Sequence, residues 1–266
     1  MFETRYVDVG WAKLAVHTVG SGPPALLIHG YPLDHRVWLD LLASPLTARN
    51  TLVAVDLRGH GMSPWAGDPV HAMELFADDC AALIQTLALG PAHVAGLSMG
   101  GYVTLALWER HPKVVRSLAL VDTRSAADSE QGKAGRMAAM DAVVNAGRRA
   151  LALAMIEALV PSDADLITKG RIASMIEFQP VETIIADLRG MRDRVDRTWV
   201  LPTVRVPALV VVGERDTLTP PAEATQIARA IPGARLVVVP GSGHLVPIDG
   251  AAVLVRELGA FWRDSE

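Results

Sequence analysis

The sequence has little cysteine: Cys80 is the only one, so no disulfide can form within the chain. Structural disulfides belong mainly to secreted proteins, and their absence favours a reducing compartment. The first residues, 1–5, carry charges of both signs and lack the apolar stretch of a secretory signal. We therefore expect a cytoplasmic protein, and 266 residues of 50% hydrophobic composition are enough to form a large core without disulfides.

An excess of basic charge is also missing. The chain has 25 Lys and Arg against 29 Asp and Glu, and its densest basic stretch, residues 189–197, is interrupted by aspartates. Proteins that bind nucleic acid present a basic stripe to the phosphates. We expect no nucleic-acid partner.

Charged side chains are absent from residues 80–108, a run long enough to cross a bilayer. Gly90-Pro91 and the glycines within residues 96–101 divide this run with turn signals. We therefore expect the run to be buried in a globular core, and we expect no association with a membrane.

Recognisable metal and dinucleotide motifs are lacking as well. The sequence contains no H-E-x-x-H, no paired C-x-x-C and no G-x-G-x-x-G after a strand-like run. We expect neither a metal ion nor a cofactor.

What the sequence does contain is a series of short apolar runs separated by amphipathic stretches. Alternating residues at 5–9 and 13–18 predict an antiparallel hairpin. Helical patterns are clearest at 73–89 and 99–111, and their alternation with apolar runs predicts a mostly parallel α/β sheet of eight strands. Runs 25–28, 52–55, 93–95 and 117–121 predict strands buried on both faces, and runs 208–212 and 235–239 predict two further strands.

The alternation stops between residues 125 and 201, where only helical patterns occur. This segment is amphipathic and not Gly/Ser-rich, so it predicts a helical cap over a site and not a linker. Ser162 and Asp165 have the spacing of a capping box, and Pro180 suits the first turn of the next helix. The predicted domains are a core of residues 1–124 and 202–266 and a cap of residues 125–201.

The sharpest local signal is Gly96-Leu97-Ser98-Met99-Gly100, between a predicted strand and a predicted helix. A tight turn of this kind lifts the Ser98 hydroxyl off the sheet edge and directs a helix N-terminus at whatever the hydroxyl attacks. Taken alone, the pattern also fits a glycine-rich turn with an N-cap serine.

A serine nucleophile needs a histidine base, and the histidine needs a carboxylate to orient it. His244 follows the last predicted strand and Asp216 follows the strand before it, so both belong at the same edge of the sheet as Ser98. Asp122, at the end of residues 117–121, is the alternative acid.

Five motifs follow one another along the chain: His29-Gly30-Tyr31-Pro32, Asp56 to Ser63, Ser98, Asp216 and His244. In this order they resemble the α/β-hydrolase fold superfamily, and the resemblance covers the whole chain. Within the superfamily, the chain looks most like small carboxylesterases, enol-lactonases and cofactor-free perhydrolases. The resemblance implies hydrolysis of a small carboxylic ester or lactone through an acyl-serine, with Ser98 as nucleophile, His244 as base and Asp216 as acid.

An oxyanion hole requires two backbone N–H groups, and the residue after the nucleophile, Met99, provides one. The second is expected from the loop after residues 25–28. Because Pro32 has no N–H, Tyr31 is the candidate. Its side chain is also a candidate for substrate binding, with a structural aromatic as the alternative.

Several activities remain open on the same residues. Perhydrolysis or halogenation with peroxide and carbon–carbon bond hydrolysis use the same triad, and a ligand receptor without catalysis is possible on the same fold. Serine at position 98 and the absence of tyrosine from residues 125–201 disfavour haloalkane dehalogenase and epoxide hydrolase activity. The sequence leaves the substrate and the oligomeric state undetermined.

Methionine is frequent in the predicted cap, and it adapts well to irregular apolar surfaces. If these side chains face Ser98, the pocket is apolar and favours short or medium acyl chains or aromatic esters. The alternative is that they pack the cap on itself. They are Met137, Met140, Met155, Met175 and Met191.

Overall fold

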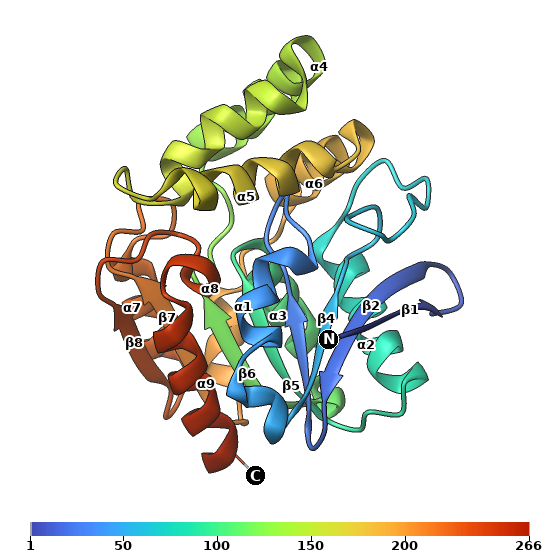
Figure 1. The fold of residues 1–266 in the computed structure, drawn as a ribbon, viewed down its shortest axis with the longest axis vertical. Helices are drawn as coiled ribbons and strands as arrows, with labels where there is room; N and C mark the ends of the chain where they lie inside the picture. The colour runs from blue at the N-terminus through green and yellow to red at the C-terminus, as the bar shows by residue number, and fades with distance from the viewer. Residues whose placement is uncertain (1, 266) are drawn as a thin grey trace.

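The centre of the computed structural model, which describes residues 2–265, is an 8-stranded sheet with the order β1-β2-β4-β3-β5-β6-β7-β8 (Figure 1). β2 pairs antiparallel with β1 and β4, and every other neighbouring pair is parallel. The strands are β1 Glu3–Asp8, β2 Lys13–Gly20, β3 Pro24–Ile28, β4 Thr51–Val55, β5 Ala92–Leu97, β6 Val115–Val121, β7 Ala208–Gly213 and β8 Arg235–Val239.

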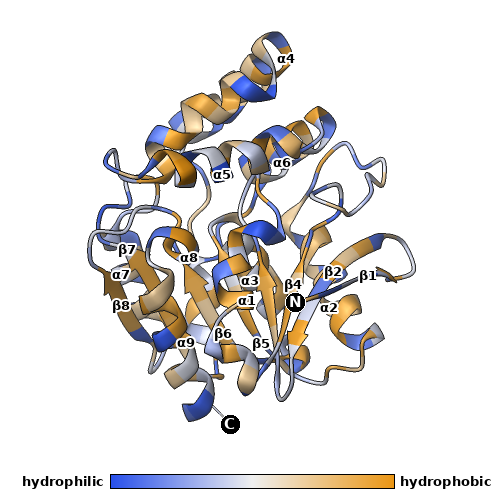
Figure 2. Ribbon diagram, viewed as in Figure 1, coloured by the Kyte–Doolittle hydropathy of each residue, from blue (hydrophilic) through white to orange (hydrophobic). Residues whose placement is uncertain are grey.

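The predicted hairpin and all the predicted buried strands are confirmed. β5 and β7 are buried along their whole length, as near-continuous apolar runs with helices on both faces should be. Figure 2 shows hydrophobic strands at the centre, with helices of mixed polarity around them. The predicted α/β-hydrolase fold class, with a mostly parallel eight-stranded sheet, is confirmed.

Helices cover both faces of the sheet. α1, α8 and α9 contact one another over one face, and α2 packs on α3 over the other (Figure 1). Among residues 2–265, no helix has both the length and the apolar composition that crossing a membrane requires. The uncharged run 80–108 is instead the end of α2, then β5, a turn and most of α3. The helices of the core, on the two faces together, are α1 Leu39–Leu42, α2 Met73–Thr86, α3 Met99–Arg110, α7 Pro221–Ala230, α8 Val246–Asp249 and α9 Ala251–Asp264.

Residues 125–201 form three helices that lie together beyond the carboxyl ends of the parallel strands, at the top of Figure 1. α4 bends at Gly147, whose φ of 80° and ψ of 174° lie outside the helical range. The bend separates the two helical patterns that the sequence shows on either side of it. The cap helices are α4 Glu130–Leu159, α5 Leu166–Phe178 and α6 Val181–Asp193. The domain boundaries at residues 124 and 201 stay a prediction.

Two predicted helix starts in this region are wrong in detail. Asp165 is itself the N-cap of α5, because its side chain accepts a hydrogen bond from the Thr168 N–H. Ser162 lies in the loop before it, so the two residues form no capping box. Pro180 precedes α6 as its N-cap residue and is not in the first turn. In both cases the helix begins later than the sequence pattern suggests.

A buried ion pair fastens α6 to the loop between β4 and α2. The Asp187 carboxylate lies 2.8 Å from His60 Nε2 and 2.7 Å from His71 Nδ1, and the three side chains are fully buried. His60 Nδ1 lies 3.1 Å from the carbonyl oxygen of Arg58. Both ring nitrogens of His60 therefore face oxygen acceptors, which favours the doubly protonated imidazolium.

The pKa values of this pair follow from its geometry. Burial alone lowers the pKa of His60, but the charge of Asp187 and its hydrogen bond outweigh burial, and the pKa is raised. Burial alone raises the pKa of Asp187, but His60 and His71 outweigh it, and the pKa is lowered. The pair is therefore ionised in the folded protein over a range of pH.

The backbone of α6 also approaches the same loop closely. His71 N–H donates to the Ala186 carbonyl oxygen at 3.0 Å, and a Cβ placed on Gly190 would lie 1.7 Å from the His71 carbonyl oxygen. Only glycine fits at this contact. The cap is thus attached to the core by packing as well as by charge.

We expect Gly190→Ala to lower the free energy of unfolding by about 1–3 kcal/mol, because α6 must move away from the His71 carbonyl. Gly170→Ala is the matched control: it lies within α5, and a Cβ there meets nothing within 4 Å. Alanine at that position should stabilise the helix by about 0.5–1 kcal/mol. Urea denaturation of both variants measures the difference, and equal effects would contradict the contact.

We expect the stability supplied by Asp187 to depend on pH. A histidine whose pKa is raised on folding stabilises the protein fully below its unfolded pKa of about 6.5 and loses that contribution as the pH rises through the folded value. The difference in melting temperature between the wild type and Asp187→Asn should therefore be largest near pH 6 and should shrink as the pH rises. The lowered pKa of Asp187 affects stability only in acid: the stability that its ionised carboxylate contributes is lost as the pH falls below about 4.

Asp193→Asn is the control for this experiment. Asp193 lies on the same helix but is exposed and pairs only with Arg192. Its removal should change the melting temperature little at any pH. A constant difference between wild type and Asp187→Asn from pH 6 to pH 9 would show that the pair is not ionised as described.

Candidate active site

The loops that follow β3 and β5 meet at a topological switch point, where the strand order along the sheet reverses direction. From β3 the chain moves to β4 on one side and then crosses to β5 on the other. Ligands of open α/β sheets bind in the crevice at such a point, at the carboxyl ends of the strands. The two loops are in contact here, because a Cβ on Gly30 would lie 3.1 Å from the Ser98 Cβ.

Ser98 occupies the turn between β5 and α3 and has φ 53° and ψ −113°. Non-glycine residues rarely adopt positive φ, and holding one there costs about 1–3 kcal/mol. The turn is fixed by hydrogen bonds: Ser98 N–H donates to the Val121 carbonyl oxygen at 2.9 Å, and the Thr123 hydroxyl donates to the Ser98 carbonyl oxygen at 2.7 Å. The hydroxyl of Ser98 is thereby held at the positive end of α3.

The glycines around Ser98 are required by close packing. A Cβ on Gly96 would lie 2.2 Å from the Gly100 carbonyl oxygen, and one on Gly100 would lie 2.3 Å from the Ile28 carbonyl oxygen. The start of α3 therefore rests directly on the ends of β3 and β5. Side chains at either position would push the helix, and Ser98 with it, away from the sheet.

The structure brings the predicted serine, histidine and acid together. Ser98 Oγ lies 2.9 Å from His244 Nε2, and His244 Nδ1 lies 2.8 Å from Asp216 Oδ2. These residues come from the loops after β5, β8 and β7, so a single edge of the sheet positions all of them. His244 and Asp216 are each only 3% exposed, which shields the polar contacts from solvent.

Thr219, which was not among the predicted site residues, completes the arrangement. Its hydroxyl donates to Asp216 Oδ2 at 2.6 Å, and the N–H groups of Leu218 and Thr219 donate to Oδ1 at 2.8 and 2.9 Å. Burial raises the pKa of Asp216, but His244 and Thr219 outweigh it and hold that pKa below its usual value. An aspartate followed by a threonine three residues later is a known local turn pattern and could have indicated the contact.

The alternative acid, Asp122, has different partners. It lies at the end of β6 with φ 45°, and its carboxylate accepts hydrogen bonds from the N–H groups of Gly213 at 2.9 Å and Val246 at 3.1 Å. Within residues 2–265 no hydrogen bond joins it to His244. Burial, followed by the nearby charge of Asp216, raises its pKa well above the usual value. Asp122 therefore ties β6 to the end of β7 and the start of α8.

Backbone amides of two residues lie beside Ser98. Met99 is the first residue of α3, where N–H groups have no partner within the helix. Tyr31 directly follows Gly30, in a turn closed by the Leu33 N–H and the Gly30 carbonyl oxygen at 2.9 Å. An oxyanion hole formed by these two amides stays a prediction.

A cavity of about 400 Å³ lies over Ser98 and His244, between the core and the cap. Of the five cap methionines, Met155 and Met191 line it, whereas Met137, Met140 and Met175 are not part of its wall. Both alternatives left open by the sequence therefore apply, each to part of the set. The apolar side chains of the wall, besides the two methionines, are Ala139, Leu151, Ala154, Ala158, Leu159, Leu188 and Leu218.

The same cavity has a polar portion that the sequence analysis did not anticipate. Its wall includes Tyr31, as expected, together with Tyr102, Arg124, Asp128 and Arg136. Arg136 lies on α4 and Arg124 in the loop between β6 and α4, and neither was among the predicted site residues. Burial, then the charge of Asp187, raises the pKa of Tyr31, so its phenol keeps its proton.

One further polar cluster could be mistaken for a metal site. Within the part of the chain that the structure describes, His17, His35 and Asp56 are the group whose potential ligand atoms lie within 4.8 Å of one another. Both Asp56 oxygens already accept backbone hydrogen bonds, from His35 at 2.7 Å and Met62 at 2.9 Å. The cluster therefore serves as a hydrogen-bond network that joins β2 to the loop after β4.

Comparison with known proteins agrees with this architecture. Residues 25–257 match the family described as Alpha/beta hydrolase family. The chain is 33% identical over 263 residues to 2-(acetamidomethylene)succinate hydrolase of Mesorhizobium japonicum, covering 92% of this chain and 90% of that protein. It is 35% identical over 225 residues to pimeloyl-[acyl-carrier protein] methyl ester esterase of Neisseria meningitidis serogroup A, covering 82% and 70%.

Solved structures of similar fold extend over nearly the whole chain. A thermophilic esterase from Thermogutta terrifontis has a TM-score of 0.93 at 33% identity and covers 99% of both chains. The enol-lactonase from Burkholderia xenovorans LB400 has a TM-score of 0.90 at 26% identity and covers 97% of this chain and 100% of that one. From its sheet order, its strained serine turn and these matches, the chain belongs to the alpha/beta hydrolase family.

Proposed function

We propose that the protein is a serine hydrolase that cleaves small carboxylic esters or lactones through an acyl-serine intermediate. The observation that carries the proposal is the chain of hydrogen bonds from Ser98 Oγ through His244 to Asp216, at 2.9 and 2.8 Å, on the floor of a cavity of about 400 Å³. The named activities of the similar proteins, among them an esterase and an enol-lactonase, also favour ester chemistry.

In the acylation step, Ser98 Oγ attacks the carbonyl carbon while His244 Nε2 takes the hydroxyl proton. Asp216 accepts a hydrogen bond from the Nδ1–H of His244, which keeps Nε2 free as the base and stabilises the imidazolium that forms. Collapse of the tetrahedral intermediate breaks the bond to the leaving oxygen, and His244 returns the proton to it. An ester thus releases its alcohol, while a lactone keeps its alcohol on the acyl chain.

The negative charge on the carbonyl oxygen is greatest in the tetrahedral intermediate. In the proposed arrangement it is held by the backbone N–H groups of Met99 and Tyr31 and by the positive end of α3. These donors are fixed by the backbone, so they need no reorganisation during the reaction. Water, activated by the same histidine, then attacks the acyl-serine and releases the acid.

We expect Ser98→Ala to lower kcat for p-nitrophenyl acetate by at least about 10³-fold, because the nucleophile of a triad carries nearly all of its turnover. Ser174→Ala, an exposed serine on α5, is the control and should keep the parental rate. A fluorophosphonate probe should label the wild type and not Ser98→Ala. Parental turnover by Ser98→Ala, or an unlabelled wild type, would favour a non-catalytic receptor instead.

We expect Asp216→Asn to lower kcat by about 10⁴-fold, because the amide no longer holds His244 in the tautomer that accepts the serine proton. Asp122→Asn should instead lower the melting temperature while kcat of the folded protein falls by less than about tenfold, because Asp122 contacts backbone amides. Steady-state kinetics and thermal unfolding separate the two effects. The opposite ranking of the two kcat values would assign the acid to Asp122.

A further inference from the structure

Arg136, on the first half of α4, lines the cavity with part of its hydrogen-bonding capacity unused. Its Nε donates to Asp128 Oδ2 at 3.0 Å. Within residues 2–265, no hydrogen bond joins its Nη1 or Nη2 to a protein group. A guanidinium offers five donors in a planar fork, so two nitrogens remain for a ligand.

The ion pair of Arg136 with Asp128 does not neutralise this part of the cavity. Asp128 Oδ1 also lies 2.8 Å from Nη1 of Arg194, whose side chain is almost fully buried. The Cζ of Arg194 stacks over the Tyr102 ring, 4.3 Å from the ring centroid. One carboxylate therefore serves two guanidinium groups. The Asp128–Arg194 pair is enough to connect these segments of the cap, which leaves the charge of Arg136 available.

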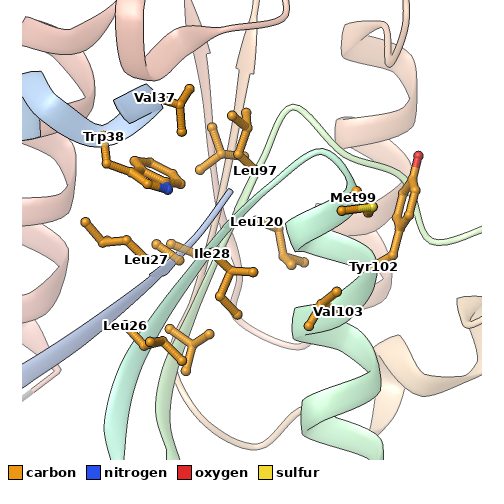
Figure 3. Packing of buried hydrophobic residues seen from close by; sticks show 14 of the residues in the cluster. Leu26, Leu27, Ile28, Val37, Trp38, Leu97, Met99, Tyr102, Val103 and Leu120 are labelled. Atoms are coloured by element: carbon orange, nitrogen blue, oxygen red, sulfur yellow. The ribbon is translucent and has the colours of Figure 1, made fainter. Parts of the chain in front are cut away.

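A second observation points to a ligand at the same place. The Tyr31 side chain is 8% exposed and lines the cavity, and its hydroxyl has no hydrogen-bond partner among the described residues. A buried hydroxyl without a partner costs about 1–3 kcal/mol, and a bound acceptor would remove that cost. In Figure 3 the Tyr102 hydroxyl points away from the packed aliphatic side chains, and Tyr102 is another residue of the cavity wall.

The charges of the wall indicate what kind of ligand fits. Arg124 and Arg136 are its two arginines, and Asp128 is its one carboxylate. Arg124 donates through Nη2 to the Leu218 carbonyl oxygen, while its Nε is buried without a partner. Asp216 is paired with His244, and Asp187, behind Tyr31, is paired with His60 and His71. Because Asp128 is shared with Arg194, the charge of the arginines exceeds that of the carboxylate, and this part of the wall is positively charged beside an otherwise apolar surface.

We propose that the substrate carries a carboxylate in addition to the ester or lactone group, and that Arg136 and the Tyr31 hydroxyl bind this carboxylate while Ser98 attacks the ester carbonyl. A carboxylate matches the positive charge of the wall and the planar fork of a guanidinium. Arg136 is then a specificity-determining residue, and Arg124 adds to the positive potential.

This inference rests on the proposed function, because it names the substrate class of the same site. Its test compares two esters that differ mainly in charge, monomethyl glutarate and dimethyl glutarate, by methanol release. The wild type should hydrolyse the monoester with the higher kcat/KM. Arg136→Gln should lower kcat/KM for the monoester by about 10–100-fold, mainly through KM, and change the diester little.

Arg149→Gln is the matched control, since Arg149 lies on the second half of α4 and is exposed. It should leave both substrates at the wild-type rate. Folding of Arg136→Gln is checked by its melting temperature, and Arg136→Lys, which retains the charge without the fork, should restore part of the preference. Two outcomes would overturn the carboxylate site: the wild type shows no preference for the monoester, or the two glutamine variants have equal effects. If the diester is still cleaved in a reaction that depends on Ser98, the proposed hydrolase activity stands.

Calorimetry with glutarate tests the carboxylate site without turnover. Glutarate should bind the wild type and Ser98→Ala, and should bind Arg136→Gln at least about tenfold more weakly. If no ester is cleaved but glutarate binding depends on Arg136, the proposed function fails and the carboxylate site stands. If glutarate does not bind, or if inorganic phosphate at the same ionic strength binds as tightly, the carboxylate assignment is wrong.

Discussion

The structure depends on one constrained turn, in which the backbone at Ser98 is held at positive φ between a buried strand and a helix. Gly96 and Gly100 allow that helix to rest on the ends of β3 and β5. Hydrogen bonds with Val121, at the end of β6, and Thr123, in the loop after it, hold the turn in place. The packing of the central sheet offsets the free-energy cost of this strained backbone conformation. As a result the serine hydroxyl has one position, to which the loops after β7 and β8 deliver their side chains.

Two buried aspartates follow neighbouring strands of this sheet and have opposite electrostatic character. Asp216 faces an imidazole and a hydroxyl, and its pKa is lowered. Asp122 faces only backbone amides, and burial together with the charge of Asp216 raises its pKa. The same residue type at equivalent strand ends can therefore pair with a histidine in one case and join segments of backbone in the other.

The cap contributes in two ways that depend on different contacts. At α6 it is attached through Asp187, His60 and the close approach of Gly190, so its position over the sheet is defined. At α4 it contributes walls of mixed character, apolar near Met155 and cationic near Arg136. The core brings Ser98, His244 and Asp216 together, whereas the helices above them form much of the cavity wall.

Much of this could be predicted from the sequence, because apolar runs, turn glycines and motif order are local properties of the chain. They determined the strands, the mostly parallel sheet, the serine turn and the order of Ser98, Asp216 and His244. Short helices such as Val246–Asp249 were missed because one turn is too short to show a helical period. The contact of Thr219 with Asp216, the partners of Asp122 and the presence of Arg136 in the cavity wall were decided only by the tertiary structure. They depend on how segments distant in sequence pack together, and no residue pattern specifies which side of a cap helix faces the site.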